Sequence, residues 1–181
     1  GCLAMLDQLA RQGISSRNIA DIGTGTGLLA FAAMALWPSA KTIASDIDPA
    51  SILVTRDNAE INRVPLGRGG GRLALAVAPG TDHPAIRHRA PYDLVVANIL
   101  AGPLITLAPD IASATASGGH AILAGLIARQ MDPVLAAYRA QGFRLAARGG
   151  SAGEGRARVL VASLCPTPTR HAMKRIGFTS G

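Results

Sequence analysis

The feature that most constrains the fold is an alternation of short apolar runs with longer stretches of helical periodicity. This alternation is typical of a parallel sheet covered by helices on both faces. The runs that predict strands are residues 18–22, 41–45, 72–77, 92–97 and 120–126. The stretches that predict helices are residues 28–36, 49–62, 104–115 and 128–141. We therefore expect an α/β, Rossmann-like, doubly wound sheet that is mostly parallel.

The pattern changes after Gly142. Residues 143–148 and 158–164 are two strand-like runs, and the Gly-rich stretch 149–155 between them has no room for a crossover helix. They predict an antiparallel hairpin at the C-terminal edge of the sheet. Residues 165–181 are Pro-rich and then basic, which predicts a poorly ordered tail after a single domain of residues 1–164.

Composition agrees with one domain in a reducing compartment. The chain has 181 residues, of which 49% are hydrophobic and 16% charged, enough apolar material for a core. Its apolar runs are too short to span a membrane. Cys2 and Cys165 lie far apart without a metal-binding or disulfide pattern, so we expect a cytoplasmic protein. The start carries no initiator Met and no secretory signal, so we expect a piece of a longer chain.

The net charge is +7, and residues 165–181 supply three of those charges through Arg170, Lys174 and Arg175 with no acid beside them. The remaining excess permits contact with RNA or another polyanion without requiring it. A solvated basic surface is the favoured explanation of this charge.

Three glycines after the first predicted strand indicate a ligand site. Gly23, Gly25 and Gly27 allow a tight turn and close approach of a ligand to the backbone, and the next helix presents free N–H groups. Leu28 occupies the position where a dinucleotide-binding loop would have its third glycine. The spacing therefore favours a nucleotide-like ligand without a pyrophosphate.

Two carboxylates narrow the ligand to S-adenosylmethionine (AdoMet). Asp46 ends the second strand about 20 residues beyond the glycines, where a carboxylate accepts ribose hydroxyls. Asp21, just before the loop, suits an ammonium group directly or through water. A tight turn with no ligand is one alternative. A nicotinamide or flavin site is another, although two carboxylates would repel its phosphates.

Five segments resemble known methyltransferases. The first two are similar to the glycine and acidic motifs of class I AdoMet-dependent enzymes, and the last three narrow the resemblance to the catalytic domain of bacterial methyltransferases that modify large-subunit ribosomal protein eleven. The segments are residues 21–27, 45–49, 57–62, 93–104 and 107–109. The resemblance covers residues 2–164 and leaves the tail out.

The resemblance implies a seven-stranded sheet, AdoMet as cofactor, and a substrate amine on a ribosomal protein with rRNA nearby. Methyl transfer from a sulfonium is an in-line displacement with a neutral leaving group, so we expect no metal. The implied cofactor-binding residues are Asp21, Gly23, Thr24, Gly25, Gly27, Asp46, Ile47 and Asn98. Members of the family also carry a substrate-recruiting domain and a Thr-containing cofactor loop ahead of the position of Cys2, and neither is present here. The third strand ends without an acid, so Thr81–Asp82 is only a candidate for the adenine contact.

Asn98 ends the fourth predicted strand, at the edge of the sheet where ligands bind. Its amide oxygen could accept an N–H of the incoming amine and orient the lone pair, but an amide cannot take the proton. Asn98 is thus the catalytic candidate, with Ile99, Leu100 and Pro103 as the substrate pocket. The alternative is that Asn98 caps the following turn.

Two other functions stay open. An RNA or small-molecule N-methyltransferase would use the same loop, although aromatic residues are only 3% of the chain and a flipped base needs a stacking partner. A non-catalytic binding module that keeps the AdoMet fold is the other.

Overall fold

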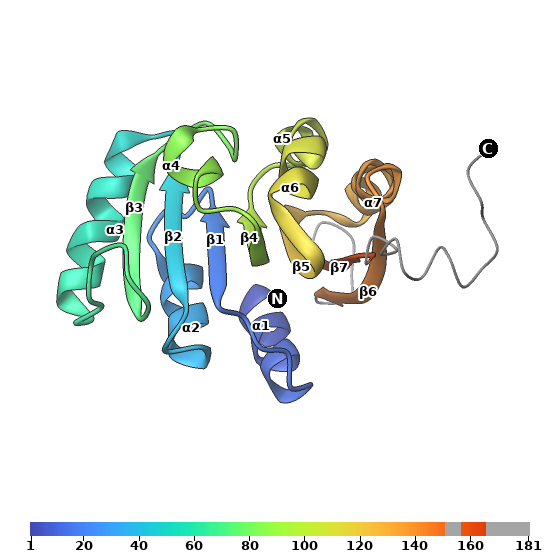
Figure 1. The fold of residues 1–181 in the computed structure, drawn as a ribbon. Helices are drawn as coiled ribbons and strands as arrows, with labels where there is room; N and C mark the ends of the chain where they lie inside the picture. The colour runs from blue at the N-terminus through green and yellow to red at the C-terminus, as the bar shows by residue number, and fades with distance from the viewer. Residues whose placement is uncertain (151–156, 166–181) are drawn as a thin grey trace, which may run out of the picture.

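The computed structural model describes residues 1–150 and 157–165 of the chain. Beyond Gly150 the predicted linker, and beyond Cys165 the predicted tail, lie outside these ranges. A seven-stranded sheet runs through the centre of the molecule in the order β3-β2-β1-β4-β5-β7-β6 (Figure 1). Its strands are β1 (Asn18–Ile22), β2 (Lys41–Asp46), β3 (Arg72–Val77), β4 (Tyr92–Asn98), β5 (Thr115–Leu126), β6 (Phe143–Gly150) and β7 (Arg158–Leu164).

One helix precedes β1, and the others lie between successive strands up to β6. They are α1 (Cys2–Arg11), α2 (Leu28–Leu36), α3 (Pro49–Ile61), α4 (Pro84–Arg87), α5 (Ala101–Thr106), α6 (Ala108–Ala114), the 3-10 turn η1 (Ala128–Gln130) and α7 (Met131–Ala140). Strands β1 to β5 pair in parallel, whereas β7 lies antiparallel to both β5 and β6. The predicted α/β, Rossmann-like, mostly parallel sheet with an antiparallel hairpin at its C-terminal edge is confirmed.

Both faces of the sheet are buried, as expected for parallel strands between helices. In β4, Leu94 and Val96 pack in a cluster with residues of α1 and α2, among them Leu6 and Leu29. The alternate β4 residues pack on the other face with Leu104 of α5 and residues of α6 and α7. The β4 side chains between these helices are therefore buried on both faces of the sheet. This is why the strand is a continuous apolar run in the sequence.

The structure corrects several predicted boundaries. The predicted helix 104–115 begins earlier and is two helices, α5 and α6, because Pro109 has no N–H to continue a single helix past Leu107. Helix α4 lies inside the predicted loop 79–91, and α1 was not predicted. Strand β5 begins at Thr115, five residues before the predicted start, and its pairing with β4 shifts register between Tyr92 and Leu94.

The topology brings the candidate residues to one edge. Because β1, β2 and β4 are adjacent and parallel, their carboxyl ends meet at the same edge of the sheet. The glycine loop follows β1, Asp46 ends β2 and Asn98 ends β4. This is the edge where open α/β sheets bind ligands.

Candidate active site

The glycine loop is tied to the end of β2. The backbone N–H groups of Gly23 and Thr24 both donate to Ser45 O, over 2.8 and 2.9 Å. Gly25 has φ +57°, and a Cβ at this position would meet nothing within 4 Å. The backbone therefore turns through a left-handed conformation that suits glycine and leaves its outer side open.

Gly23 allows the loop after β4 to pack against the glycine loop. Its φ is +73°, and a Cβ there would collide with Cγ2 of Ile99. Only a residue without a side chain lets Ile99 sit this close. The predicted requirement for glycine at this position is thus explained by packing as well as by conformation.

Helix α3 holds the loop from the other side. Thr55 Oγ1 donates to Gly25 O over 3.0 Å, and Asn58 Nδ2 donates to Thr26 O over 2.9 Å. Neither residue was predicted to have a role. Their three-residue spacing, which places them on one face of the helix, is the sequence feature that could have indicated a shared contact.

Asp46 is oriented by two backbone groups. Its Oδ2 accepts from Gly25 N over 2.9 Å, and its Oδ1 accepts from Asp48 N over 3.1 Å. A carboxylate has about four acceptor positions, so both oxygens can still accept a hydroxyl. The side chain predicted to bind ribose is therefore already held in one orientation.

Asp21 lies behind the loop. Its side chain is 1% exposed, and its Oδ2 accepts from Thr24 Oγ1 over 2.7 Å and from Ala30 N over 3.1 Å. Its Oδ1 is buried and has no hydrogen-bond partner among the described residues. Burial, opposed by those hydrogen bonds and reinforced by the charge of Asp46, raises the pKa of Asp21 to about 6. Asp21 does not line a cavity, so its charge would act on a ligand across Thr24.

Two cavities of about 410 Å³ each flank the loop and share Gly23 and Asn98 on their walls. The first contains Thr24 and Thr26 from the loop and Gly125 near the end of β5, together with residues of α1 and β7. The second contains Asp46 and Ile47. Of the predicted cofactor-binding residues, Asp21, Gly25 and Gly27 line neither cavity and shape the loop behind them.

The predicted substrate-pocket residues all lie in the second cavity. Ile99, Leu100 and Pro103 line it together with Asp46 and Ile47. Leu100 and Ile47 are 73% and 71% exposed. Large apolar side chains left this exposed at a cavity mouth are available for an apolar ligand surface.

Asn98 is exposed at the end of β4, and no side-chain hydrogen bond joins it to another residue of the described ranges. Helix α5 has Leu100 as its N-cap and no side-chain capping bond. The alternative that Asn98 caps this turn is therefore wrong. Its amide stays available on the wall that the two cavities share.

The candidates for the adenine contact, Thr81 and Asp82, do not line the second cavity. Thr81 is buried, and Asp82 pairs with Arg87 over 3.0 Å at the surface. The residues that do line it are Ala78, Pro79 and Gly80, directly after β3. This part of the wall has no acidic side chain and is formed by apolar side chains and backbone.

The N-terminal wall of the first cavity was not predicted. Cys2 and Leu3 of α1 line this cavity together with Arg158 and Val159 of β7. Burial raises the pKa of the Cys2 thiol. Because α1 was not predicted, no local pattern could have connected these residues to the site.

Within residues 1–150 and 157–165, no group of three or more His, Cys, Asp and Glu side chains is placed to hold a metal ion. The same part of the chain has no helix long and apolar enough to cross a bilayer.

Residues 1–152 match the family described as ribosomal protein L11 methyltransferase (PrmA). The chain is 43% identical over 144 residues to the ribosomal protein L11 methyltransferase of Mesorhizobium japonicum, covering 80% of this chain and 47% of the relative. It thus spans about half the length of that relative.

Two solved structures share the fold. The ribosomal protein L11 methylase of Lactobacillus delbrueckii subsp. bulgaricus superposes with a TM-score of 0.69 at 30% identity, over 89% of this chain and 79% of that one. Magnesium protoporphyrin IX methyltransferase (ChlM) of Synechocystis PCC 6803, solved with bound SAM, gives a TM-score of 0.68 at 16% identity, over 89% and 78% of the chains. The second similarity concerns the fold alone.

Proposed function

Because the chain belongs to the ribosomal protein L11 methyltransferase family, we propose that it binds AdoMet and takes part in methylating an amino group of a ribosomal protein. The observation that carries the proposal is the pair of cavities that meet at Gly23 and Asn98. One offers a ribose-binding carboxylate and apolar walls, and the other offers polar loop residues backed by a buried carboxylate.

The residues present fit AdoMet. Asp46, held by Gly25 and Asp48, would accept the ribose hydroxyls. Ile47 and the residues after β3 and β4 would cover the adenine. Thr24 would face the amino-acid portion, with the unpartnered Oδ1 of Asp21 behind it to attract an ammonium. AdoMet supplies an electrophilic methyl group on a sulfonium, so no covalent enzyme intermediate is needed.

Asn98 would position the substrate amine. Its amide oxygen accepts an N–H and directs the nitrogen lone pair, while the proton must leave by another route, since an amide is not a base at neutral pH. A lysine is neutral at pH 7.4 only at a free-energy cost of about 4 kcal/mol. The apolar side chains of Ile99 and Leu100 beside Asn98 would lower that cost, because they disfavour the ammonium form.

The substrate and partners follow from the family. We propose ribosomal protein L11, which the names of the relatives specify, with ribosomal RNA near it as a second partner and the bacterial cytoplasm as the place of reaction. None of the described residues lining the two cavities is aromatic, so a flipped nucleobase would find no stacking surface. A protein amine is therefore favoured over an RNA base.

The proposal is tested by two measurements on this chain and on a longer chain that spans the full relatives. Calorimetric titration measures AdoMet binding, and labelled AdoMet with purified ribosomal protein L11 measures methyl transfer. Saturable binding by both chains with transfer by the longer one is the expected result. Binding without transfer by either would favour the non-catalytic module, and no binding by either would contradict the cofactor assignment.

A further inference from the structure

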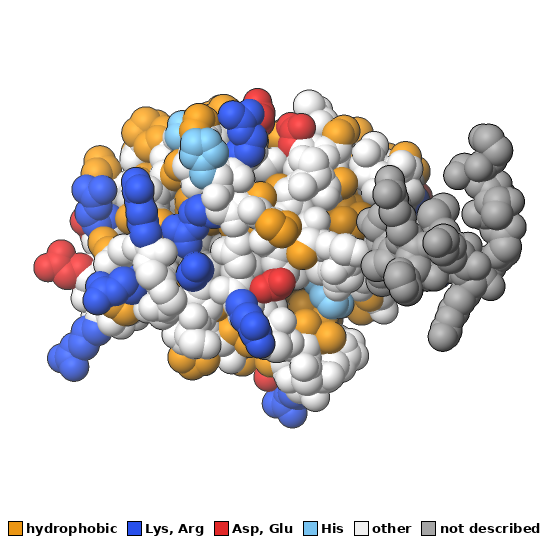
Figure 2. Space-filling model, viewed as in Figure 1, with side chains coloured by type: hydrophobic (Ala, Val, Ile, Leu, Met, Phe, Trp, Pro, Cys, Tyr) orange, Lys and Arg blue, Asp and Glu red, His pale blue; other side chains and the backbone are white. Residues whose placement is uncertain are grey.

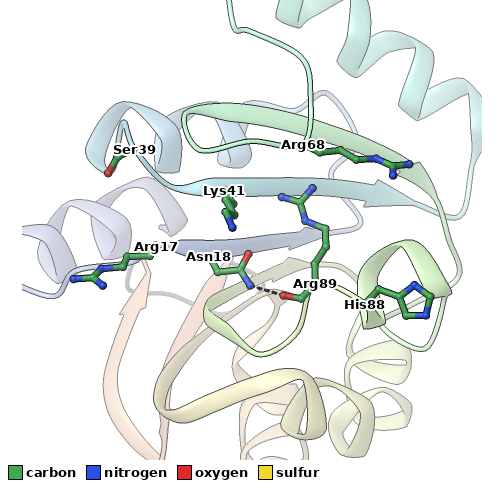
Figure 3. A pocket seen from close by; sticks show the side chains of 7 residues that line it. All are labelled: Arg17, Asn18, Ser39, Lys41, Arg68, His88 and Arg89. Carbon is green, nitrogen blue, oxygen red and sulfur yellow. Dashed lines mark hydrogen bonds between the residues drawn. The ribbon is translucent and has the colours of Figure 1, made fainter.

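A basic cavity lies at the edge of the sheet opposite the candidate active site. Its volume is about 610 Å³, and it is lined by Arg17, Asn18, Ser39, Lys41, Arg68, His88 and Arg89 (Figure 3). Asn18 begins β1 and Lys41 begins β2, so the cavity is at the amino ends of the strands whose carboxyl ends carry the glycine loop and Asp46. We call these seven residues the basic groove.

The cations of the groove have no carboxylate partner. No described acid forms an ion pair with Arg17, Lys41, Arg68 or Arg89. Asp93 of β4 lies beside the start of β1, but its Oδ2 accepts from the backbone N–H groups of Arg17 and Asn18, over 2.8 and 3.0 Å. Its hydrogen bonds therefore go to the backbone, and the groove keeps an excess of positive charge.

The positive charge of Arg89 is disfavoured by its position inside the groove. The Asn18 side chain donates to Arg89 O and to Pro91 O and so fixes the backbone beside β1. Burial and the nearby charge of Arg68 both lower the pKa of Arg89. Like charges placed this way repel one another, and an anion in the groove would relieve the repulsion.

The cations are spread along the groove instead of converging on one point. In Figure 3, Arg89 extends across the cavity towards Lys41 in the middle, while Arg17 and Arg68 extend from opposite rims in opposite directions. Figure 2 shows several Lys and Arg side chains over the half of this face formed by β1, β2 and β3, with few acidic ones among them. This distribution suits an extended chain of negative charges better than a single ion.

The lining also indicates the chemistry of the ligand. Pockets for small organic molecules are lined mostly by hydrophobic and aromatic side chains, whereas the residues that line this one are polar or cationic. None of the residues that line it is Phe, Tyr or Trp, the large aromatic side chains on which a base would stack. Sequence-independent contact with phosphates, by arginine and lysine, is the recognition that such walls provide.

We propose that the basic groove binds the phosphodiester backbone of a nucleic acid, with Lys41 and Arg89 at the centre and Arg17 and Arg68 at the rims. The inference extends the RNA contact of the proposed function, and it does not depend on methyl transfer. Because the groove is at the opposite edge of the sheet, a bound nucleic acid would leave the cofactor edge free for a protein substrate.

The test is a fluorescence anisotropy titration of the full 181-residue chain with a labelled single-stranded RNA of about 20 nucleotides, and with DNA of the same sequence. The groove variant is Lys41→Gln/Arg89→Gln. The control, Arg56→Gln/Arg139→Gln, removes the same charge from the exposed faces of α3 and α7. A second groove variant, Arg17→Gln/Arg68→Gln, changes only exposed side chains and guards against misfolding of the first.

We expect each groove variant to bind RNA at least tenfold more weakly at low salt and the control to stay within about twofold. Loss of two phosphate contacts should also make the slope of log affinity against log salt shallower by about 1.4. Binding of RNA or DNA that the groove variants weaken supports the proposal. Whichever nucleic acid binds more tightly identifies the source of the phosphates.

Three results would overturn the inference: no binding at low salt, equal losses in the groove and control variants, or displacement of RNA by poly-glutamate as effectively as by unlabelled RNA. The last would indicate an acidic protein partner. None of these results bears on AdoMet binding or on methyl transfer to ribosomal protein L11, which are measured separately, so a failure here would remove only the RNA contact from the proposed function.

Discussion

The backbone N–H of Gly25 donates a hydrogen bond of 2.9 Å to Oδ2 of Asp46 and so joins the loop after β1 to the end of β2. The carboxylate expected to bind ribose is thus also part of the structure of the glycine loop. A side chain held in this way loses less conformational entropy when a ligand binds. Asp46 should therefore matter for affinity more than its neighbour Asp48, which faces α3.

Asp46→Ala should weaken AdoMet binding by about 1–3 kcal/mol, because both the ribose contact and the orientation of the loop are lost. Asp48→Ala is the matched control. Asp48 caps α3 by accepting from Ala50 N over 2.9 Å, so its loss should lower stability by about 1 kcal/mol and affect affinity less. Calorimetric titration and thermal unfolding measure the two effects, and equal losses of affinity in both variants would argue against a ribose contact.

Asp21→Asn should stabilise the protein at alkaline pH. Burial raises the pKa of Asp21 from 3.8 to about 6, so ionisation in the folded state costs roughly 3 kcal/mol above pH 6. The folded protein holds the proton more tightly than the unfolded chain, and the cost therefore disappears as the pH falls from about 6 to below 4. The variant's advantage in free energy of unfolding should follow the same window.

The same substitution should weaken AdoMet binding, because it removes the negative charge behind Thr24. Denaturant unfolding at pH 8 and pH 4 measures stability, and titration at pH 8 measures affinity. A variant that is less stable at pH 8 would show that the buried charge is stabilised by contacts other than those to Thr24 and Ala30.

Asn98→Ala should lower kcat for methyl transfer by about 10–100-fold, because the substrate amine loses its orienting acceptor. AdoMet affinity should change less than kcat, since Asp46 and the glycine loop are intact. Thr106→Ala, an exposed change on α5, serves as the control and should keep both values. Single-turnover kinetics with ribosomal protein L11 and a full-length chain separate the rate of methyl transfer from the affinity for AdoMet. A larger effect on affinity than on kcat would mean that Asn98 contacts only the cofactor.

Gly23→Ala should destabilise the protein by at least about 2 kcal/mol, because a Cβ at φ +73° is strained and also collides with Ile99. Ile99→Ala removes the colliding Cγ2. In a double-mutant cycle, the double variant should lose less free energy of unfolding than the two single variants together. We expect the difference to exceed about 0.5 kcal/mol. Strict additivity in urea unfolding would mean that the backbone strain alone accounts for the effect.

The sequence predicts those residues of the candidate site that directly follow a strand, because a local pattern marks them. Gly23, Asp46 and Asn98 follow directly after strands, and the ends of adjacent parallel strands must meet at one edge, so their assembly could be expected from the sequence. Thr55 and Asn58 could not be assigned in this way. Their hydrogen bonds to the loop depend on how α3 is placed over β2 and β3, which no local pattern encodes.

The sequence by itself determined the type of most elements and the identity of the glycine loop, because periodicity and turn chemistry act between near neighbours. It did not determine the break between α5 and α6 or the early start of β5, where a proline and a register shift decide the outcome. The basic groove belongs wholly to the tertiary structure. Arg17, Lys41, Arg68 and Arg89 come from four separate segments, and only the parallel order of β1 and β2 with the loops before β3 and β4 brings their charges into one cavity.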